Sequence, residues 1–494
     1  MENNIRYRIF WTWDYCTRWD HSYYVRGRGA FGPNQRRTHF LEDYCRMVDF
    51  AANHGINGIV IWGALRAHDN GEKQLKTLIG YGRKKGVRIL PGAGIFSYGG
   101  VYYDTRRDFN GWIDIPATQY NEYSLHSWLV RHPEYRAVGR DGVPYATGMY
   151  SDVACPSEGE NLEWFKRALE WLLTDVGADG VQVEIGDYMV CYCDRCEKRR
   201  AHSVGDAVFA AEDMAEPYLA ACEVAGRVKK DAWVICETYS SFAKKTERDI
   251  YGAFGATFDE GQKKMFSRLP GNAVLQWAMD RAVGFRPVHE WDKDVWLPHE
   301  NNIARIHAGS QHGLNSSEEW AIHPIGDLVK KVRQSGVNGV SIFGEESPVS
   351  PPNEANYLVF SEFCGYGNPN PECDMPLFYS QTLDPLYGGS GYAKEWERLY
   401  VTGYTARLNR AIMGAGKDPL SFRPAHLAIG DDSLVEKVCA MTPSERRSLA
   451  EGLAREAHDI SSKLSGEPCR RWSWLENWLW RSEYLHATHI DVGV

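Results

Sequence analysis

The chain repeats one pattern in which an amphipathic, helix-like run ends at a glycine and is followed by a short apolar run. Gly55-Ile-Asn-Gly58-Ile-Val-Ile-Trp-Gly63 returns as Gly177-Ala-Asp-Gly180-Val-Gln-Val-Glu-Ile-Gly186, and again as Gly336-Val-Asn-Gly339-Val-Ser-Ile-Phe-Gly344. The first glycine of each copy can adopt the left-handed conformation that ends a helix. Helix, glycine, buried strand and glycine-containing loop together form the repeating unit of an α/β fold.

Eight such strands are predicted, near residues 6–13, 58–63, 87–92, 180–186, 232–238, 273–280, 302–308 and 339–345. Helices are predicted between most of them, including 40–54, 72–85, 158–175 and 319–335. Eight strand–helix units favour a (β/α)8 TIM barrel over residues 1–350. An open doubly wound sheet is the rival, but no GxGxxG motif follows the first strand. Residues 351–494 are predicted to form a mostly helical C-terminal region, with helices at 444–461 and 472–485.

Polar side chains share one face of several of these strands. Because successive side chains of a strand point to opposite faces, Gln182 and Glu184 are expected to point into the barrel, away from Val181, Val183 and Ile185. The same alternation selects Glu345, Asp280, Arg305 and His307, whereas the face of Glu237 stays ambiguous. Buried carboxylates are costly unless paired. The candidate catalytic residues are therefore Glu184, Glu345, Asp280 and Glu237, and the alternative is a salt-bridge network in which Arg305 pairs with Glu184 or Glu345.

Two long connections, 93–157 and 281–301, follow predicted strands and would lie on the face where barrel active sites form. Aromatic residues make up 13% of the chain, which suits carbohydrate because flat rings stack on sugar C–H faces. Candidate substrate-binding residues are Asp187, Trp62, Tyr98, Arg305, His307, Trp277 and Gln182. Core packing is the alternative for the tryptophans, and capping of the following turn is the alternative for Asp187.

A cysteine-rich segment follows the fourth predicted strand. Cys191, Cys193 and Cys196 have the C-x-C-x-x-C spacing of thiols that can converge on a tetrahedral metal, with His202 or Asp194 as fourth ligand. A structural zinc ion there would hold the loop that carries Asp187. Reduced thiols used only for packing are the alternative. No cofactor is expected to be needed for catalysis.

Charge and composition limit the partners. The net charge of -9 argues against nucleic acid and anionic membranes, and no apolar stretch is long enough for a membrane span. The N-terminus has no apolar signal segment and the 12 cysteines are scattered, which favours the cytoplasm. A small-molecule or oligosaccharide substrate is expected. Trp472, Trp474, Trp478 and Trp480 leave open whether the helical region docks on the barrel or forms a homo-oligomer.

The residues also resemble a known family. The run from His132-Pro-Glu-Tyr through Cys155-Pro-Ser and Trp164 to Gly180-Val-Gln-Val-Glu-Ile-Gly-Asp-Tyr, followed by the cysteine-rich loop, looks like bacterial barrels related to glycoside hydrolase family 20. Ala355-Asn-Tyr-Leu-Val-Phe-Ser-Glu362, with Tyr387-Gly-Gly, is similar to the start of their helical C-terminal region. The resemblance covers roughly residues 1–400, and only the fourth-strand motif is specific.

The resemblance implies a fourth-strand carboxylic acid, matched by Glu184, as the proton donor. In family 20 an adjacent Asp-Glu pair ends this strand and supports attack by the acetamido group of the substrate. Here Ile185 and Gly186 separate Glu184 from Asp187. This departure argues against N-acetylhexosamine specificity and against substrate-assisted catalysis.

The sequence thus predicts an exo-acting glycoside hydrolase with a two-carboxylate mechanism. Glu184 would protonate the leaving oxygen, with Glu345 first, and Asp280 or Glu237 next, as the partner. One alternative is a metal-dependent sugar isomerase, epimerase or lyase that uses His307, Glu184 and Asp280 around a divalent ion. Another is a carbohydrate-binding protein without catalysis.

Overall fold

The computed structural model describes residues 5–13, 36–65, 71–97, 99–102, 121–145, 152–184, 190–200, 211–238, 266–278, 297, 299–307, 320–343, 348–365, 370, 372–407 and 432–488. The chain divides into two compact units. The first comprises Met1–Arg281, Val288–His307 and Lys331–Ser347. The second comprises Ala282–Pro287, Ala308–Lys330 and Pro348–Val494.

The first unit is built on a closed barrel in which eight parallel strands pair in chain order, β1 to β8, and β8 pairs back with β1. The strands are β1 (Tyr7–Trp13), β2 (Gly58–Trp62), β3 (Arg88–Gly94), β4 (Gly180–Glu184), β5 (Trp233–Glu237), β6 (Ala273–Ala278), β7 (Asn302–His307) and β8 (Gly339–Phe343). The predicted (β/α)8 architecture is confirmed, and each predicted strand agrees with the observed one to within three residues at either end.

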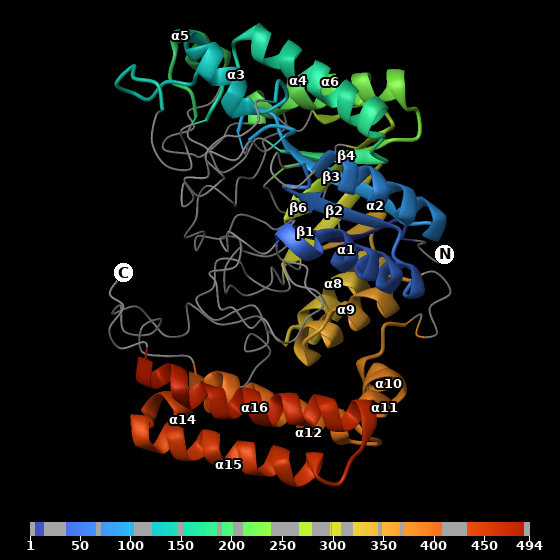
Figure 1. Cartoon of the computed structure of the whole chain (residues 1–494), viewed down its shortest axis with the longest axis vertical. Helices are drawn as coiled ribbons and strands as arrows, with labels where there is room; N and C mark the ends of the chain where they lie inside the picture. Colours follow the sequence, from blue (N-terminus) through green and yellow to red (C-terminus); the bar gives the residue numbers. More distant parts are fainter. Residues whose placement is uncertain are drawn as a thin grey trace. The chain divides into compact units, whose positions relative to one another are not determined.

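Helices cover the outside of this barrel (Figure 1). The first unit contains α1 (Arg36–Asn53), α2 (Gly71–Lys85), α3 (Leu125–Arg131), the 3-10 helix η3 (Pro133–Tyr135), α4 (Gly159–Trp171), the π-helix η5 (Leu172–Val176), α5 (Asp194–Arg199) and α6 (Ala211–Val228). Of these, α3 and η3 lie in the connection after β3, and α5 lies in the connection after β4. Helix α2 contacts β3, and α6 contacts β4 and β5. Gly177, which follows η5, has a φ of 81°, the left-handed conformation expected at this helix end, whereas Gly336 has an ordinary φ.

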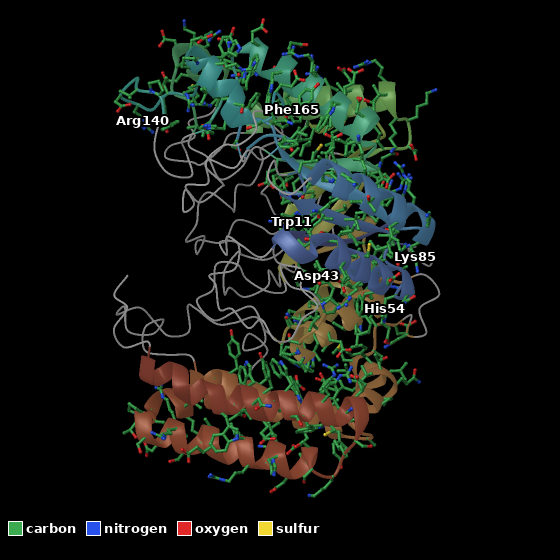
Figure 2. All side chains as sticks on the ribbon, viewed as in Figure 1. Trp11, Asp43, His54, Lys85, Arg140 and Phe165 are labelled. Carbon is green, nitrogen blue, oxygen red and sulfur yellow. The ribbon has the colours of Figure 1, made fainter. Side chains whose placement is uncertain are left out.

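Alternate residues of the strands fill the barrel interior, as the pleat of a strand requires. The buried interior cluster contains Tyr7, Ile9, Trp11, Val60, Trp62, Leu90, Ile235, Val274 and Ile303. Trp11 lies on β1, as Figure 2 shows. Gly92 on β3 leaves the space that the indole of Trp62 occupies, because a side-chain carbon at position 92 would lie 2.3 Å from that ring.

The second unit is helical. Its helices are α8 (Ile322–Arg333), α9 (Pro351–Cys364), α10 (Met375–Phe378), the π-helix η6 (Tyr379–Leu383), α11 (Asp384–Tyr387), α12 (Tyr392–Arg407), α14 (Asp432–Ala440), α15 (Pro443–Ser461) and α16 (Gly466–Thr488), with the last residues of α8 belonging to the first unit. The two predicted C-terminal helices correspond to α15 and α16. In the core of this unit the rings of Trp396 and Tyr400 stack with their centroids 5.0 Å apart. Within the described part of the chain, no helix has the length and apolar character needed to cross a membrane.

Candidate active site

Strand β4 places Glu184 at its carboxyl end, the end of the barrel where active sites of this fold form. The side chain of Glu184 shares a face of β4 with Gln182, which contacts interior residues, so it points inward as predicted. Only 5% of Glu184 is exposed. Val181 and Val183 are fully buried on the opposite face. A carboxyl group at this position is held close to the barrel axis by the rigid sheet.

Gln182 accepts two hydrogen bonds from tryptophans of neighbouring strands. Its Oε1 accepts the indole N–H of Trp62 at 2.7 Å, and it also accepts the indole N–H of Trp11. Because an indole nitrogen can only donate, these contacts fix the amide oxygen toward β1 and β2 and turn the amide nitrogen the other way. We call Trp11, Trp62 and Gln182 the indole cluster.

Glu237 lies on the inward face of β5, which resolves the ambiguity left by the sequence. Its Oε2 accepts a hydrogen bond from Nε2 of Gln276 at 2.6 Å and lies 3.0 Å from Nη1 of Arg305. Glu237 has no exposed surface, and Arg305 is 5% exposed. The ion pair and the hydrogen bond from Gln276 together fix this carboxyl group in place. We call Glu237, Gln276 and Arg305 the Glu237 triad.

The sequence raised the alternative that Arg305 pairs with Glu184 or Glu345. The structure assigns to Arg305 an ion pair with Glu237, because β5 and β7 both flank β6 and bring the two side chains together. Arg305 therefore does form an ion pair inside the barrel, and its partner in the structure is Glu237, which the sequence had not suggested for this role.

Three uncharged side chains of the barrel each have a buried polar atom without a hydrogen-bond partner among the described residues. These atoms are Nε2 of Gln182, Oε1 of Gln276 and Oγ of Ser341. All three side chains are fully buried and lie on β4, β6 and β8. Unpaired polar atoms at such positions are costly, and bound water or polar substrate groups commonly satisfy them.

Several predicted site residues lie outside the described residues, namely Glu345, Asp280, Asp187 and Tyr98. His307 ends strand β7, but its side chain is not among those described. In the sequence, Asp280 follows β6 and Glu345 follows β8, so both come after strands whose carboxyl ends form the same rim as Glu184.

Trp277 occupies the face of β6 opposite Gln276. Its indole N–H donates to Oδ1 of Asn302 at 2.9 Å, and the side chain is 5% exposed. Since Gln276 points into the barrel toward Glu237, Trp277 points toward the surrounding layer. This position favours packing for Trp277 over the predicted contact with substrate, whereas Trp62 does lie in the interior cluster.

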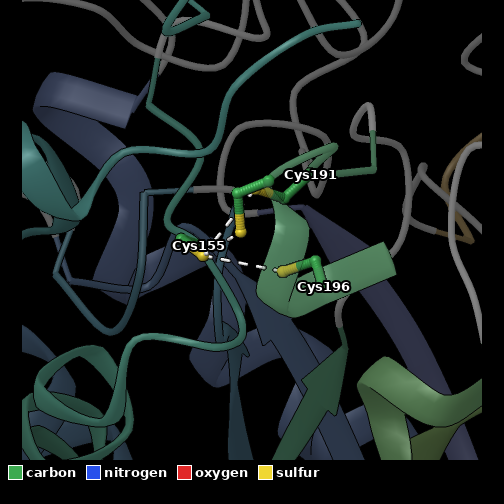
Figure 3. Close-up of side chains that lie close together, drawn as sticks. Cys155, Cys191 and Cys196 are labelled. Carbon is green, nitrogen blue, oxygen red and sulfur yellow. Dashed lines mark hydrogen bonds between the residues drawn. The ribbon is translucent and has the colours of Figure 1, made fainter. Parts of the chain in front are cut away.

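Four cysteine thiols converge at the cysteine-rich segment. Three of these cysteines, Cys155, Cys191 and Cys196, are labelled in Figure 3. Cys191, Cys193 and Cys196 are joined by Cys155, and their four sulfur atoms lie within 4.8 Å of one another. Cys155 was not predicted as a ligand, because it is far from the other three in the sequence. His202 lies outside the described residues, and Asp194 is exposed at the start of α5, so the structure offers Cys155 as the fourth ligand instead.

Comparisons with known proteins support the fold. No family model and no curated protein matches the sequence. An O-GlcNAc hydrolase of Thermobaculum terrenum, solved as a mutant, has a similar structure with a TM-score of 0.50 and 11% identity, over 98% of this chain and 83% of that protein. A maltogenic α-amylase, AmyB, from Thermotoga neapolitana aligns with a TM-score of 0.36 and 13% identity, over 75% of this chain and 79% of that one. At these identities the first likeness shows the shared fold.

Proposed function

We propose that the chain is a glycoside hydrolase that removes a terminal sugar from a glycoside or oligosaccharide, with Glu184 as the general acid. The observation that carries this proposal is the nearly buried carboxyl of Glu184 at the carboxyl end of β4, pointing into a closed barrel. Burying a carboxyl group there costs stability, which a catalytic role would explain. The proposal also extends to this chain the class of reaction named for the O-GlcNAc hydrolase of similar fold.

Glycoside hydrolysis by this route needs a second carboxylate across the scissile bond from the acid. Glu345 is our first candidate and Asp280 the second, because each follows a strand that ends at the same rim of the barrel. Glu237 ranks below them, since its carboxylate is fully buried and engaged by Arg305 and Gln276. We assign Glu237 an electrostatic role in ordering the barrel interior.

In the proposed reaction Glu184 gives its proton to the glycosidic oxygen while the second carboxylate attacks the anomeric carbon or activates water. A separation of about 5–5.5 Å between the two carboxyl groups would give retention of configuration, and about 6.5–9.5 Å would give inversion. The amide N–H groups of Gln182, which no described residue accepts, are suited to bind water or a sugar hydroxyl deep in the barrel. Trp62, beside them, offers an apolar ring.

The test is hydrolysis of aryl α- and β-glycosides, uronides included, by the wild type, Glu184→Gln and the control Glu163→Gln. Glu163 is exposed on α4, where it pairs with Lys166, so its substitution should leave activity unchanged. For glycosides with poor leaving groups, Glu184→Gln should lower kcat/KM about 10²–10⁴-fold. For dinitrophenyl glycosides, whose leaving group needs no proton, the loss should be much smaller.

If Glu184→Gln lowered kcat/KM equally for both kinds of leaving group, Glu184 would not be the general acid. Hydrolysis of no glycoside in the panel would overturn the proposed function. Strict dependence of turnover on added Mg²⁺, Mn²⁺ or Co²⁺ would point instead to the metal-dependent isomerase or lyase class.

A further inference from the structure

Cys155, Cys191, Cys193 and Cys196 form a cluster that the proposed hydrolase chemistry does not use. We propose that these four thiolates bind one structural zinc ion in tetrahedral geometry and so join the segment after β3 to the segment after β4. The inference is independent of the proposed function, because it concerns residues outside the barrel interior.

The spacing of the sulfur atoms fits one zinc ion. With Zn–S bonds of about 2.3 Å, a regular tetrahedron places its sulfurs about 3.8 Å apart. The sulfur of Cys155 lies 3.6 Å from that of Cys196, and 3.7 Å from those of Cys191 and Cys193. A disulfide would need about 2.05 Å, and all four cysteines are free thiols. The convergence of four thiols, rather than the contact of a single pair, is the arrangement that a tetrahedral metal needs.

Local structure holds each ligand in place. Cys155 follows the β-bridge between Arg136 and Ala154, and its backbone N–H donates to the carbonyl of Tyr135 at 2.9 Å. The buried side chain of Asn161 donates to the carbonyls of both Tyr135 and Cys155. These contacts fix Cys155 through the backbone, without using its sulfur.

On the other side, the remaining ligands lie just before and within helix α5. Cys193 precedes the helix and Cys196 lies one turn later, so their side chains fall on the same side. The backbone N–H of Tyr192 donates to the carbonyl of Val138 at 2.9 Å, which ties this segment to the chain that leads to Cys155. Cys155, Cys191 and Cys196 are buried, so a bound metal would be shielded from water.

The surroundings also supply the hydrogen bonds and charges that a metal–thiolate centre needs. The backbone N–H of Val138 donates to the sulfur of Cys191 at 3.5 Å, and Ser157 Oγ lies 3.0 Å from the sulfur of Cys196. Zinc binding would release the four thiol protons and leave a net charge of -2 on the centre. Arg199 and Arg200, three and four residues after Cys196, bring positive charge to the same segment.

These arginines are themselves fixed by one buried acid. Both pair with Asp213, a fully buried residue of α6, and Arg200 also donates to the carbonyl of Cys191 at 2.5 Å. Arg199 donates to the carbonyl of Pro156, next to Cys155, at 2.9 Å. The arginines therefore connect the backbones of both ligand-bearing segments, as outer-shell residues of structural zinc sites do.

The test is metal analysis and X-ray absorption spectroscopy at the zinc edge on the full-length wild type, purified without added metal. We expect about one zinc per chain with four sulfur neighbours near about 2.3 Å. Three sulfurs with one nitrogen or oxygen would remove Cys155 from the site. Iron in place of zinc, or four thiols that all react freely with a thiol reagent in the folded protein, would overturn the proposal.

Substitution provides the second measurement. Cys155→Ser should lower the zinc content at least fivefold and lower Tm, while Cys45→Ser, at a half-buried thiol outside the cluster, should keep both unchanged. Zinc retained in full by a folded Cys155→Ser variant would contradict the assignment of this ligand. If Cys155→Ser does not fold, the wild-type spectrum alone decides the outcome.

Discussion

Nη1 of Arg305 lies 3.0 Å from Oε2 of Glu237 inside the barrel, and both side chains are almost completely removed from solvent. Breaking such a pair leaves a buried charge without its partner, which typically costs about 3–5 kcal/mol of stability. We therefore expect Arg305→Met and Glu237→Gln each to lower the free energy of unfolding by about this amount. The double variant should lose less than the sum of the two. Urea denaturation of the full chain measures all three.

The matched control is Lys76→Met, which breaks the exposed pair between Lys76 and Glu72 on α2. Exposed pairs of this kind contribute about 0–1 kcal/mol. If the Arg305 and Glu237 variants cost no more than this control, the Glu237 triad does not stabilise the barrel.

Gln182 is the shared acceptor of two buried indoles, which leads to a second prediction. Gln182→Met removes this acceptor from the N–H groups of Trp11 and Trp62, and each buried donor left unsatisfied costs about 1–3 kcal/mol. Gln182→Glu keeps an acceptor oxygen for the two indoles, so it should change the tryptophan fluorescence less than Gln182→Met does. Gln381→Met, at an exposed position of η6, is the control. Equal stability of Gln182→Met and wild type would show that the indoles find other partners.

Glu362 on α9 gives a pH prediction for the second unit. Burial raises the pKa of its carboxyl, although its Oε2 accepts the hydroxyl of Thr382 at 2.5 Å. The folded state then binds a proton more tightly than the unfolded state, so ionisation of Glu362 lowers stability as pH rises from the unfolded pKa of about 4.3 through the folded pKa. Glu362→Gln should therefore raise Tm at pH 7 and have little effect near pH 4.

Glu445 provides the control of opposite sign for this pH series. Hydrogen bonds from Thr442 lower the pKa of the Glu445 carboxyl. Glu445 thereby completes the capping box at the start of α15. Its stabilising effect is present above the unfolded pKa and is lost as the pH falls through the folded pKa. Glu445→Gln should therefore lower the Tm at pH 7. A Glu362→Gln variant whose Tm falls at pH 7 as well would contradict the assigned cost of burying Glu362.

Much of the fold could be predicted because its signals are local. The alternation in β4 assigned Gln182 to the interior, and the glycine that ends the preceding helix, Gly177, has the expected left-handed backbone. Both depend on residues within a few positions of one another. The same reasoning gave eight strand–helix units, which favour a closed barrel, and the absence of a GxGxxG motif argued against an open doubly wound sheet.

Contacts between distant segments could not be predicted in this way. Cys155 joins the cluster only because the segment after β3 returns beside the segment after β4, and no spacing rule links Cys155 to Cys191. Likewise the sequence could not show that Glu237 is the partner of Arg305, because this depends on which inward-pointing carboxylate lies at the same level along the barrel axis. The alternation in β5 was obscured because Ile235 and its neighbours are apolar on both faces.

The contact between Gly92 and Trp62 has a consequence for how this barrel can change during evolution. The indole lies where any side chain at position 92 would have to go, and it also donates to Gln182. A chain that gains a side chain at position 92 must therefore lose the large ring at position 62, and Gln182 then keeps only Trp11 as an indole donor. We expect positions 62 and 92 to covary in relatives of this protein, so that a side chain gained at position 92 is accompanied by a smaller residue at position 62.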